Sequence, residues 1–348
     1  MQLFAILEQL FSRADTSGKE KGVLDWIACF LKRFSFEVRW QEYSPGRWNL
    51  HAWRGKNPPP FLIVTHVDVW GKEPEGRCRV EGGFVRGRGA ADPLGQVVAL
   101  LLALSRSSTP AEVVFFSEEE TTGAGSWNFQ FAREIRGALV LEPTNFAVCT
   151  ALAGDLDFKV EIEGLAAHGA FPQSGVNAIS RAREVIDGCY RAVASFPSHP
   201  LFSPPLSLML GKIEGGSSSY VVPDRCLLEC CLPFPPPLTV SQAEATLLRF
   251  IPQAGVKVEV LDQNPAFELS AKEEIVEKLV LSIRQRVGFS PVLAGMPSWT
   301  DATYLNLRGI PSIVFGAGDL SLAHSEREMV SLKELAVLTD ILGQFLTE

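Results

Sequence analysis

FLIVTHVDVW (residues 61–70) is an apolar run that ends in His66 and Asp68. A short apolar run of this kind is typical of a strand that is buried on both faces of a parallel sheet. Functional side chains collect at the carboxyl ends of such strands, because helices and loops diverge there and leave a crevice. His66 could bind a borderline metal ion, and Asp68 could orient its ring. Taken alone, a His and an Asp at this spacing are more often structural, so a site here depends on partners elsewhere.

Three later runs repeat the pattern: VVFF (113–116), ALVLE (138–142) and PSIVFG (311–316). Helix-like segments such as Gly95–Leu104 separate these runs. Buried strands that alternate with helices predict an α/β domain, with a mixed, mainly parallel sheet flanked by helices.

The first forty residues are predicted to be helical. Ser17 and Glu20 have the spacing of a capping box. The apolar residues that follow recur at the spacing of one helical face: Val23, Ile27, Phe30, Leu31 and Phe34. We therefore expect an amphipathic helix that packs on the core.

The pattern changes near residue 153. Polar and apolar residues alternate over Asp157–Ile162, as in a half-solvated antiparallel strand, and the alternation returns at KVEVL (257–261). A helix-like stretch, Val176–Ala194, lies between them. This order predicts a catalytic domain that is interrupted by an inserted α+β domain. The predicted boundaries are 1–153 and 265–348 for the catalytic domain and 154–264 for the insert.

The 348 residues carry a formal net charge of -8, with 46% apolar and 21% charged residues. This is an ordinary globular composition, and because no cluster of Lys and Arg stands out we expect no nucleic-acid partner. The longest apolar stretch, Val97–Leu104, is too short to cross a bilayer, and no targeting segment is evident, so we expect no membrane association. Seven cysteines without a CxxC pair predict a reducing cytoplasm and no thiolate zinc site. Any metal ion would then be bound by His and carboxylate side chains.

Four further segments place such side chains at strand ends or in the loops beside them. Asp92 lies in a Gly-rich turn before an apolar helix, where it could equally be a helix N-cap. Glu118–Glu120 follow VVFF, although an acidic run is usually a solvated loop. Glu142 ends ALVLE, and His324 follows PSIVFG and a Gly-rich loop. Each alone could be structural, but together with His66 they are a complete set of nitrogen and oxygen ligands for two zinc ions.

The motifs TH-x-D (65–68), GRGAAD (87–92), SEEETTGAGS (117–126), LEPT (141–144) and FGAG with AHSERE (315–328) resemble, in order and spacing, those of the M20 metallopeptidase family. That family includes acetylornithine deacetylases, succinyl-diaminopimelate desuccinylases, aminoacylases and glutamate carboxypeptidases. The similarity covers nearly the whole chain, since GLAAHGAFPQSGVNAI (164–179) and GGSSSYVVPDR (215–225) resemble the family's lid domain. The resemblance implies a zinc-peptidase-like catalytic domain with an inserted lid and dimerisation domain.

The resemblance also implies two divalent metal ions. Zinc is expected, with cobalt or manganese as alternatives, because a mixed His and carboxylate site accepts several metals. Asp92 would bridge the two ions. His66 and Glu142 would complete one site, and Glu120 and His324 would complete the other.

Catalytic roles follow from the resemblance for Asp68, Glu119 and His168. When TTGAGS is matched to the family's Thr/Ser/Gly stretch, Glu119 is the general base that takes a proton from the attacking water. A slip of one residue would give that role to a neighbouring glutamate. Asp68 would orient His66, and His168 would stabilise the oxyanion from the lid, in dimeric members by reaching across from the partner subunit. The alternative is that His168 is a solvent-facing loop residue. The resemblance also implies a homodimer through the lid.

The implied activity is hydrolysis of the amide bond of an N-acyl amino acid, as in the deacetylases and desuccinylases. Two alternatives stay open: a dipeptidase or carboxypeptidase, or a catalytically silent binding protein that retains the fold. Three positions depart from the family pattern, since Tyr220 replaces an Asn, Pro233 stands near the place of a carboxylate-binding Arg, and Pro93-Leu94 replaces Met-Lys. The reaction type is therefore better defined than the substrate.

Overall fold

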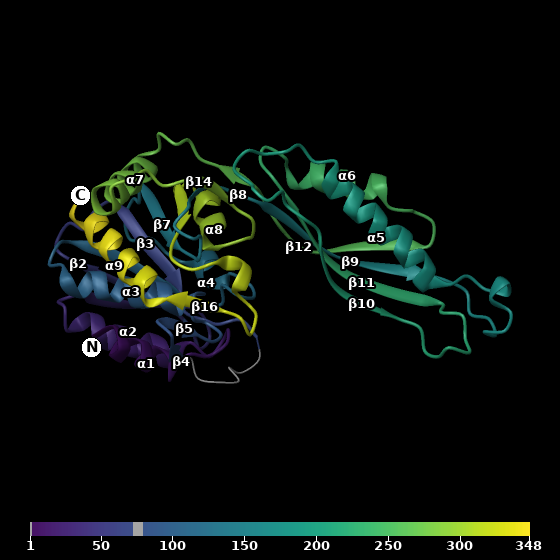
Figure 1. The fold of residues 1–348 in the computed structure, drawn as a ribbon, viewed down its shortest axis with the longest axis horizontal. Helices are drawn as coiled ribbons and strands as arrows, with labels where there is room; N and C mark the ends of the chain where they lie inside the picture. The colour runs from purple at the N-terminus through teal and green to yellow at the C-terminus, as the bar shows by residue number, and fades with distance from the viewer. Residues whose placement is uncertain (1, 72–78) are drawn as a thin grey trace. The chain divides into compact units, whose positions relative to one another are not determined.

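The computed structural model describes residues 2–71 and 79–348 of the chain, which divide into two compact units (Figure 1). The first unit contains the described residues up to Thr150 together with Leu269–Ala294 and Thr300–Glu348, and the second contains Ala151–Glu268 and Gly295–Trp299. The insert predicted at 154–264 lies within the second unit. The predicted fold class, an α/β unit with an inserted α+β unit, is confirmed.

A mixed sheet forms the core of the first unit. Its strands are β1 (Glu37–Ser44), β2 (Arg47–Arg54), β3 (Phe61–His66), β6 (Ala111–Phe116), β7 (Gly137–Leu141), β8 (Val148–Leu152) and β15 (Ser312–Phe315), in the spatial order β1-β2-β6-β3-β7-β15-β8. The four strands predicted from apolar runs, β6, β3, β7 and β15, are neighbours that pair in parallel. All four are buried over their full length, which confirms the prediction of a mainly parallel central sheet.

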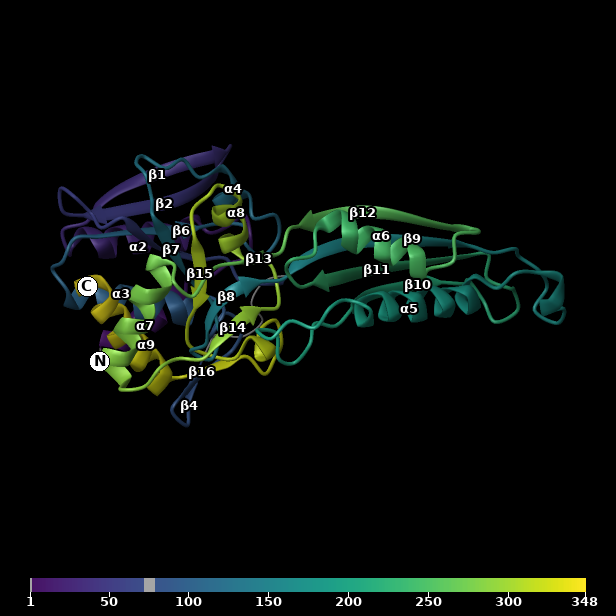
Figure 2. The ribbon, with the colours of Figure 1, turned by 90° about the horizontal axis from the view of Figure 1, so that it is seen from above.

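Helices pack on both faces of this sheet. They are α1 (Gln2–Phe11), α2 (Lys21–Lys32), α3 (Leu94–Arg106), α4 (Ala124–Asn128), α7 (Glu274–Val287), α8 (Asp301–Leu307), α9 (Leu332–Thr347) and the 3-10 turn η2 (Leu320–Leu322). Figure 2 shows α3, α7 and α9 gathered on one side of β15 and the adjacent pair α4 and α8 on the other. The predicted helix at Gly95–Leu104 is confirmed as α3, which is buried from Leu94 to Leu104. Within 2–71 and 79–348, no helix is both long and apolar enough to span a membrane.

A short strand system connects distant parts of the chain. Three strands form a small separate sheet: β4 (Arg79–Glu81), β5 (Phe84–Arg86) and β16 (Met329–Ser331). β5 and β16 pair in antiparallel fashion, and the N–H of Gly87 donates to the carbonyl oxygen of Glu328. The loop before α3 is thereby held beside the segment before α9. The remaining short strands are β13 (Phe267–Glu268) and β14 (Leu293–Met296).

The N-terminal region is helical only in part. Val23, Ile27 and Leu31 are buried on one face of α2, as the periodicity predicts. The expectation of helix fails from Glu37 onward, because β1 begins there and pairs with β2.

The capping box predicted from Ser17 and Glu20 is wrong. Glu20 is itself the N-cap residue of α2, and no side chain caps that helix. The hydroxyl of Ser17 donates to Asp68 over 2.6 Å, and Glu20 accepts hydrogen bonds from the backbone N–H groups of Gly18 and Glu118. Both side chains therefore bond to segments outside the helix rather than cap it.

The second unit is an antiparallel sheet with helices on one face. Its elements are β9 (Gly154–Glu163), β10 (Met209–Gly215), β11 (Arg225–Phe234), β12 (Val256–Asn264), α5 (Ala178–Ala194), α6 (Val240–Phe250) and the 3-10 turn η1 (Pro172–Ser174). The strand order is β10-β11-β9-β12. Buried and part-exposed residues alternate along β9, which confirms the predicted half-solvated strand. The predicted helix at Val176–Ala194 is α5, which begins two residues later because Asn177 caps it.

Candidate metal centre

The carboxyl ends of three neighbouring parallel strands carry the predicted ligands. His66 is the last residue of β3, Glu118–Glu120 follow β6, and Glu142 follows β7. Asp92 lies in the loop before α3, and His324 follows η2. Parallel strands deliver their ends to one edge of a sheet, so residues far apart in sequence converge there.

Asp92 lies between the two histidines and directs one carboxylate oxygen at each. Its Oδ1 is 3.0 Å from Nε2 of His66, and its Oδ2 is 3.5 Å from Nε2 of His324. Glu142 Oε1 is 3.6 Å from His66 Nε2, and Glu120 Oε2 is 3.0 Å from His324 Nε2. The possible metal-binding groups among the described residues are His66–Glu119–Glu120 and two groups that share Asp92, namely His66–Asp92–Glu142 and Asp92–Glu120–His324. We call the two that share Asp92 the inner group and the outer group.

The charges and unpaired atoms of the two groups fit divalent cations. Glu120 Oε1 and Glu142 Oε1 are buried, and neither has a hydrogen-bond partner among the described residues. Burial, and then the charge of Asp92, raise the pKa of Glu120 to about 7. Burial also raises the pKa of Glu142 to about 8, against the opposing charge of His66. Buried carboxylates that repel one another are costly alone, and cations bound between them would remove that cost.

The three consecutive glutamates point in different directions. Glu118 has a left-handed backbone, with φ of 62°. Its carboxylate accepts a hydrogen bond from the Tyr43 hydroxyl over 2.8 Å and lies 3.5 Å from the Arg47 guanidinium. Glu119 Oε2 instead lies 3.9 Å from His66 Nε2. Glu119 and Glu120 therefore face the histidines, and Glu118 does not.

Burial raises the pKa of Glu119 well above its usual value. The charge of His66 opposes the rise, and the charges of Glu142 and Glu120 add to it. Asp301, at the start of α8, is a further fully buried carboxylate, and its charge adds to the rise in the pKa of Glu119. Burial raises the pKa of Asp301 to about 7. The sequence motifs did not single out Asp301.

Three buried carboxylates that are not predicted ligands hold the backbone of the ligand loops. Asp68 accepts hydrogen bonds from the N–H groups of Glu119 and Glu120, at 3.2 and 3.1 Å. Its Oδ1 also lies 3.5 Å from His66 Nδ1, in the ring that Asp68 is predicted to orient. Glu20 accepts from the N–H of Glu118 at 3.1 Å. These bonds fix the position of all three glutamates in the loop.

Glu328 holds the loop that carries Asp92 in the same way, by accepting hydrogen bonds from its backbone. It is 1% exposed. Its Oε1 accepts from the N–H groups of Ala91 and Asp92 at 2.9 and 3.0 Å, and its Oε2 accepts from Gly89 at 3.0 Å. Glu328 belongs to the AHSERE motif, but no spacing rule links it to a loop more than two hundred residues earlier.

Replacement of Glu328 by Ala is expected to weaken cation binding about 10- to 100-fold, the usual cost of losing a residue that positions a ligand. Three buried N–H groups would lose their acceptor, and each one left unsatisfied lowers the free energy of unfolding by about 1–3 kcal/mol. Calorimetric titration with zinc and thermal unfolding measure the two effects. Glu328→Gln should lose less zinc affinity and less stability, because its amide oxygen can still accept a hydrogen bond. The exposed neighbour Glu326→Ala is the control, and a Glu328→Ala protein that bound zinc like the parent would contradict this role.

His168 lies in a loop of the second unit, apart in sequence and in unit from the other predicted site residues. The residue is exposed, and a β-bridge joins it to Val221. Its Nδ1 accepts a hydrogen bond from the N–H of Ala170 over 3.1 Å. In a neutral ring the proton is therefore on Nε2, which is free to donate.

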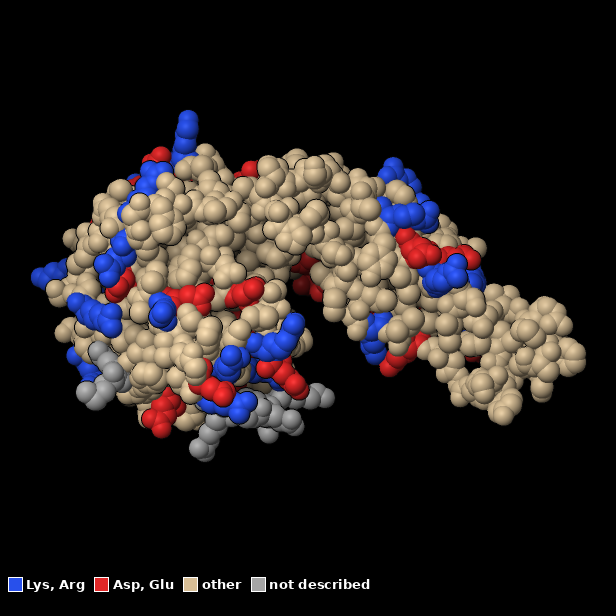
Figure 3. All heavy atoms as spheres, viewed as in Figure 1, with Lys and Arg blue, Asp and Glu red and all other residues tan. Residues whose placement is uncertain are grey.

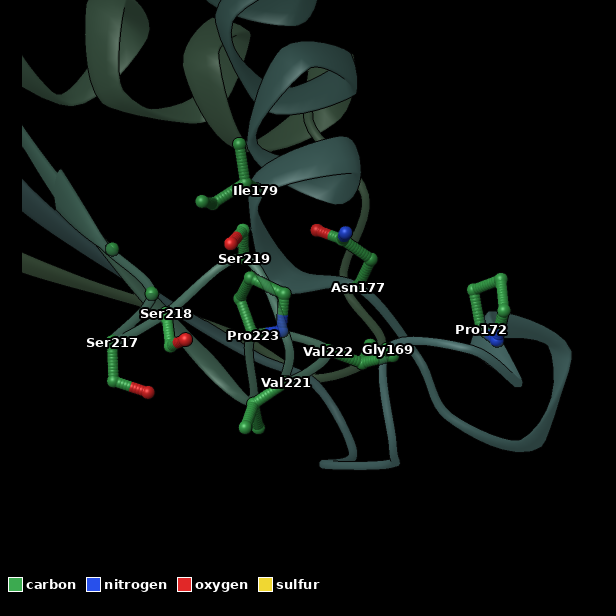
Figure 4. A pocket seen from close by; sticks show the side chains of 12 residues that line it. Gly169, Pro172, Asn177, Ile179, Ser217, Ser218, Ser219, Val221, Val222 and Pro223 are labelled. Atoms are coloured by element: carbon green, nitrogen blue, oxygen red, sulfur yellow. The ribbon is translucent and has the colours of Figure 1, made fainter.

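A cavity of about 490 Å³ adjoins this loop within the second unit (Figure 4). Figure 4 shows the hydroxyls of Ser217, Ser218 and Ser219 and the side-chain amide of Asn177 around it. No charged residue lines it among the described ones. The cavity can therefore offer neutral hydrogen bonds but no ion pair.

Comparisons with known proteins show the family of the chain. Residues 62–348 match Peptidase family M20/M25/M40. Acetylornithine deacetylase of Photorhabdus laumondii subsp. laumondii is 24% identical over 356 residues, which cover 94% of this chain and 90% of that protein. N-acetyl-L-citrulline deacetylase of Xanthomonas campestris pv. campestris is 25% identical over 337 residues, which cover 91% of this chain and 88% of that protein.

A solved structure extends the likeness to the fold. A tripeptidase from Staphylococcus aureus subsp. aureus mu50 has a TM-score of 0.79 and 18% sequence identity, and the match covers 99% of this chain and 97% of that chain. The region that matches the family contains every residue of the inner and outer groups. From this match over residues 62–348, the chain belongs to peptidase family M20/M25/M40, a metal-dependent family, and is an enzyme of the amidohydrolase and metallopeptidase class.

Proposed function

We propose that this enzyme hydrolyses the amide bond of N-acyl amino acids and holds two divalent cations, zinc foremost, in its inner and outer groups. The observation that carries the proposal is the carboxylate of Asp92, which directs one oxygen at His66 and the other at His324. When bound, the cations would supply Lewis-acid activation of a water molecule and of the amide carbonyl. A donor set of imidazole nitrogen and carboxylate oxygen suits zinc, and it also accepts cobalt or manganese.

Glu119 is the general base of the proposed reaction. Its carboxylate faces His66, whereas that of Glu118 is occupied by Tyr43 and Arg47. Glu119 takes a proton from the attacking water and delivers it to the amine nitrogen as the C–N bond breaks. Asp68 faces the ring of His66 and accepts from the N–H of Glu119, so one buried carboxylate positions both a ligand and the base.

His168 stabilises the oxyanion in this proposal. Its Nδ1 is occupied by the N–H of Ala170, which leaves an N–H at Nε2 to donate to a developing negative charge. A backbone contact between Gly169 and Tyr220 fixes the loop around it, because the N–H of Gly169 donates to the carbonyl oxygen of Tyr220 over 2.7 Å.

We also propose that the enzyme is a homodimer through the second unit. β10 is an edge strand, and Met209 and Ile213 on it are 61% and 52% exposed. An edge with exposed apolar side chains is a template for pairing with another chain. On the face shown in Figure 3, the end of the second unit carries few Lys, Arg, Asp or Glu side chains, and Phe171 and Tyr220 of this unit are exposed. Light scattering from purified enzyme that gave only a monomer mass would contradict the dimer.

The N-acyl amino acid substrate rests on the relatives and on the neutral cavity. Both deacetylases named above are similar over at least 88% of their own length. Pro233 is buried in β11 and supplies no guanidinium, so a bidentate ion pair with a substrate carboxylate is not available from that position. The uncharged lining of the cavity suits a substrate part that needs hydrogen bonds without an ion pair.

A substrate panel tests the function. The enzyme, freed of metal with a chelator and reloaded with zinc, is expected to hydrolyse N-acetyl or N-succinyl amino acids faster than unblocked di- and tripeptides, and the chelated form is expected to be inactive. The measurement is amine release, compared as kcat/KM. Faster hydrolysis of unblocked peptides would instead assign a peptidase activity. Full activity in the chelated form would contradict the metal requirement.

A further inference from the structure

The two histidines of the metal centre are supported unequally. His66 is 1% exposed, and Asp68 lies 3.5 Å from its Nδ1. The side chain of His324 is 44% exposed, and its backbone is left-handed with φ of 59°. Metal-binding histidines usually have a carboxylate, carbonyl or water on the other ring nitrogen, which fixes the ring. Among the described residues, carboxylates lie within 4 Å of Nε2 of His324 but not of its Nδ1.

Trp70 supplies a different support. Its indole ring stacks on the imidazole of His324, with centroids 5.0 Å apart and planes inclined by 17°. Asp92 and Glu120 approach His324 only at Nε2, so they restrain the tip of the ring but not its plane. A parallel ring against one face restrains the plane itself. Trp70 lies at the end of FLIVTHVDVW, four residues after His66, so the same loop serves both ligand groups.

The stack also responds to a bound cation. An imidazole that coordinates a divalent ion loses electron density, whereas the face of an indole ring is electron-rich. Their attraction is therefore stronger when the ion is bound than when it is not. A contact that is stronger in the bound state raises affinity, because only a difference between two states shifts their equilibrium.

We propose that Trp70 is a positioning residue that sets the cation affinity of the outer group through its stack on His324. The proposal rests on the function proposed above, in which both groups hold cations. The proposal predicts that loss of the indole lowers the cation affinity of the outer group and leaves that of the inner group unchanged. The inner group has no contact with Trp70 among the described interactions and keeps its own support from Asp68.

Calorimetric titration of chelator-treated protein with zinc tests this proposal. The parent is expected to bind two ions. Trp70→Ala should lower the zinc affinity of the weaker site about 10-fold, as the loss of a ligand-supporting residue does. The affinity of the tighter site should not change. Trp70→Phe should remain within roughly 3-fold of the parent, because a phenyl ring can still stack. Trp127→Ala is the matched control, since Trp127 is 55% exposed and packs on Tyr304 instead.

Fluorescence gives a second readout that is independent of activity. Cobalt bound to His324 should quench the emission of the stacked Trp70, and the second ion to bind should therefore cause the larger quench. Trp70→Phe should abolish that second step while its titration still shows two ions. If Trp70→Ala bound both ions like the parent, or weakened both equally, the role of Trp70 would be overturned. If the parent itself bound fewer than two ions, the proposed two-cation function would fail first.

Discussion

Glu119→Gln is expected to lower kcat for amide hydrolysis roughly 10²- to 10⁴-fold, the usual contribution of a positioned general base. Glutamine has the size and polarity of glutamate but cannot take a proton from water. Two zinc ions should still bind, because the two groups that share Asp92 do not include Glu119, and the third possible group, His66–Glu119–Glu120, keeps its imidazole and the Glu120 carboxylate. Steady-state kinetics and zinc analysis on one preparation therefore separate proton transfer from metal loss.

Glu118→Gln is the matched control for Glu119→Gln. Its carboxylate contacts Tyr43 and Arg47 rather than the histidines, so kcat should change little. The opposite result, a large loss for Glu118→Gln and a small loss for Glu119→Gln, would mean that the base is one residue earlier than proposed.

Asp92→Ala is expected to empty both ligand groups at once. Each group has three protein side chains, and the same carboxylate belongs to both. Zinc affinity should fall by more than about 100-fold at both sites, beyond the loss caused by changing a residue that merely supports a ligand. Hydrolysis should fall to background. Metal content after gel filtration, together with kinetics at saturating zinc, measures the two losses.

Single-site variants make the Asp92 result specific. Glu142→Ala should weaken ion binding in the inner group, and Glu120→Ala should weaken ion binding in the outer group. Each variant should keep one ion. Asp155→Asn changes an equally buried carboxylate of the second unit, where Oδ1 accepts from Asn264, and should alter neither ion. If Asp92→Ala kept one ion at parental affinity, the carboxylate would not be shared.

The central strands and the ligands at their ends could be predicted because each leaves a local pattern. Short apolar runs indicated β3, β6, β7 and β15, and parallel pairing then placed His66, Glu120 and Glu142 at one edge. The family motifs supplied Asp92 and His324, which lie in loops that no periodicity describes.

Asp68 was predicted to orient His66, but the support that Glu20 and Glu328 give could not be predicted, because their partners are backbone N–H groups far along the chain. Glu328 bonds to a loop more than two hundred residues away, and every residue in such a loop except proline has the same N–H. The spacing of Ser17 and Glu20 suggested a local cap. In the structure Ser17 instead donates to Asp68, and Glu20 accepts from the N–H of Glu118. The stack of Trp70 on His324 likewise joins a strand end to a loop near the C-terminus and has no sequence signature.

Asp68, Glu20 and Glu328 accept hydrogen bonds from the peptide backbone of the ligand loops. The loops should therefore keep their course when the side chain at 92, 119 or 120 is changed. A chemically dead variant such as Glu119→Gln would then present uncleaved substrate to a site of native form. Soaking or co-crystallising that variant with a panel of acylated amino acids could capture the intact compound and identify it directly.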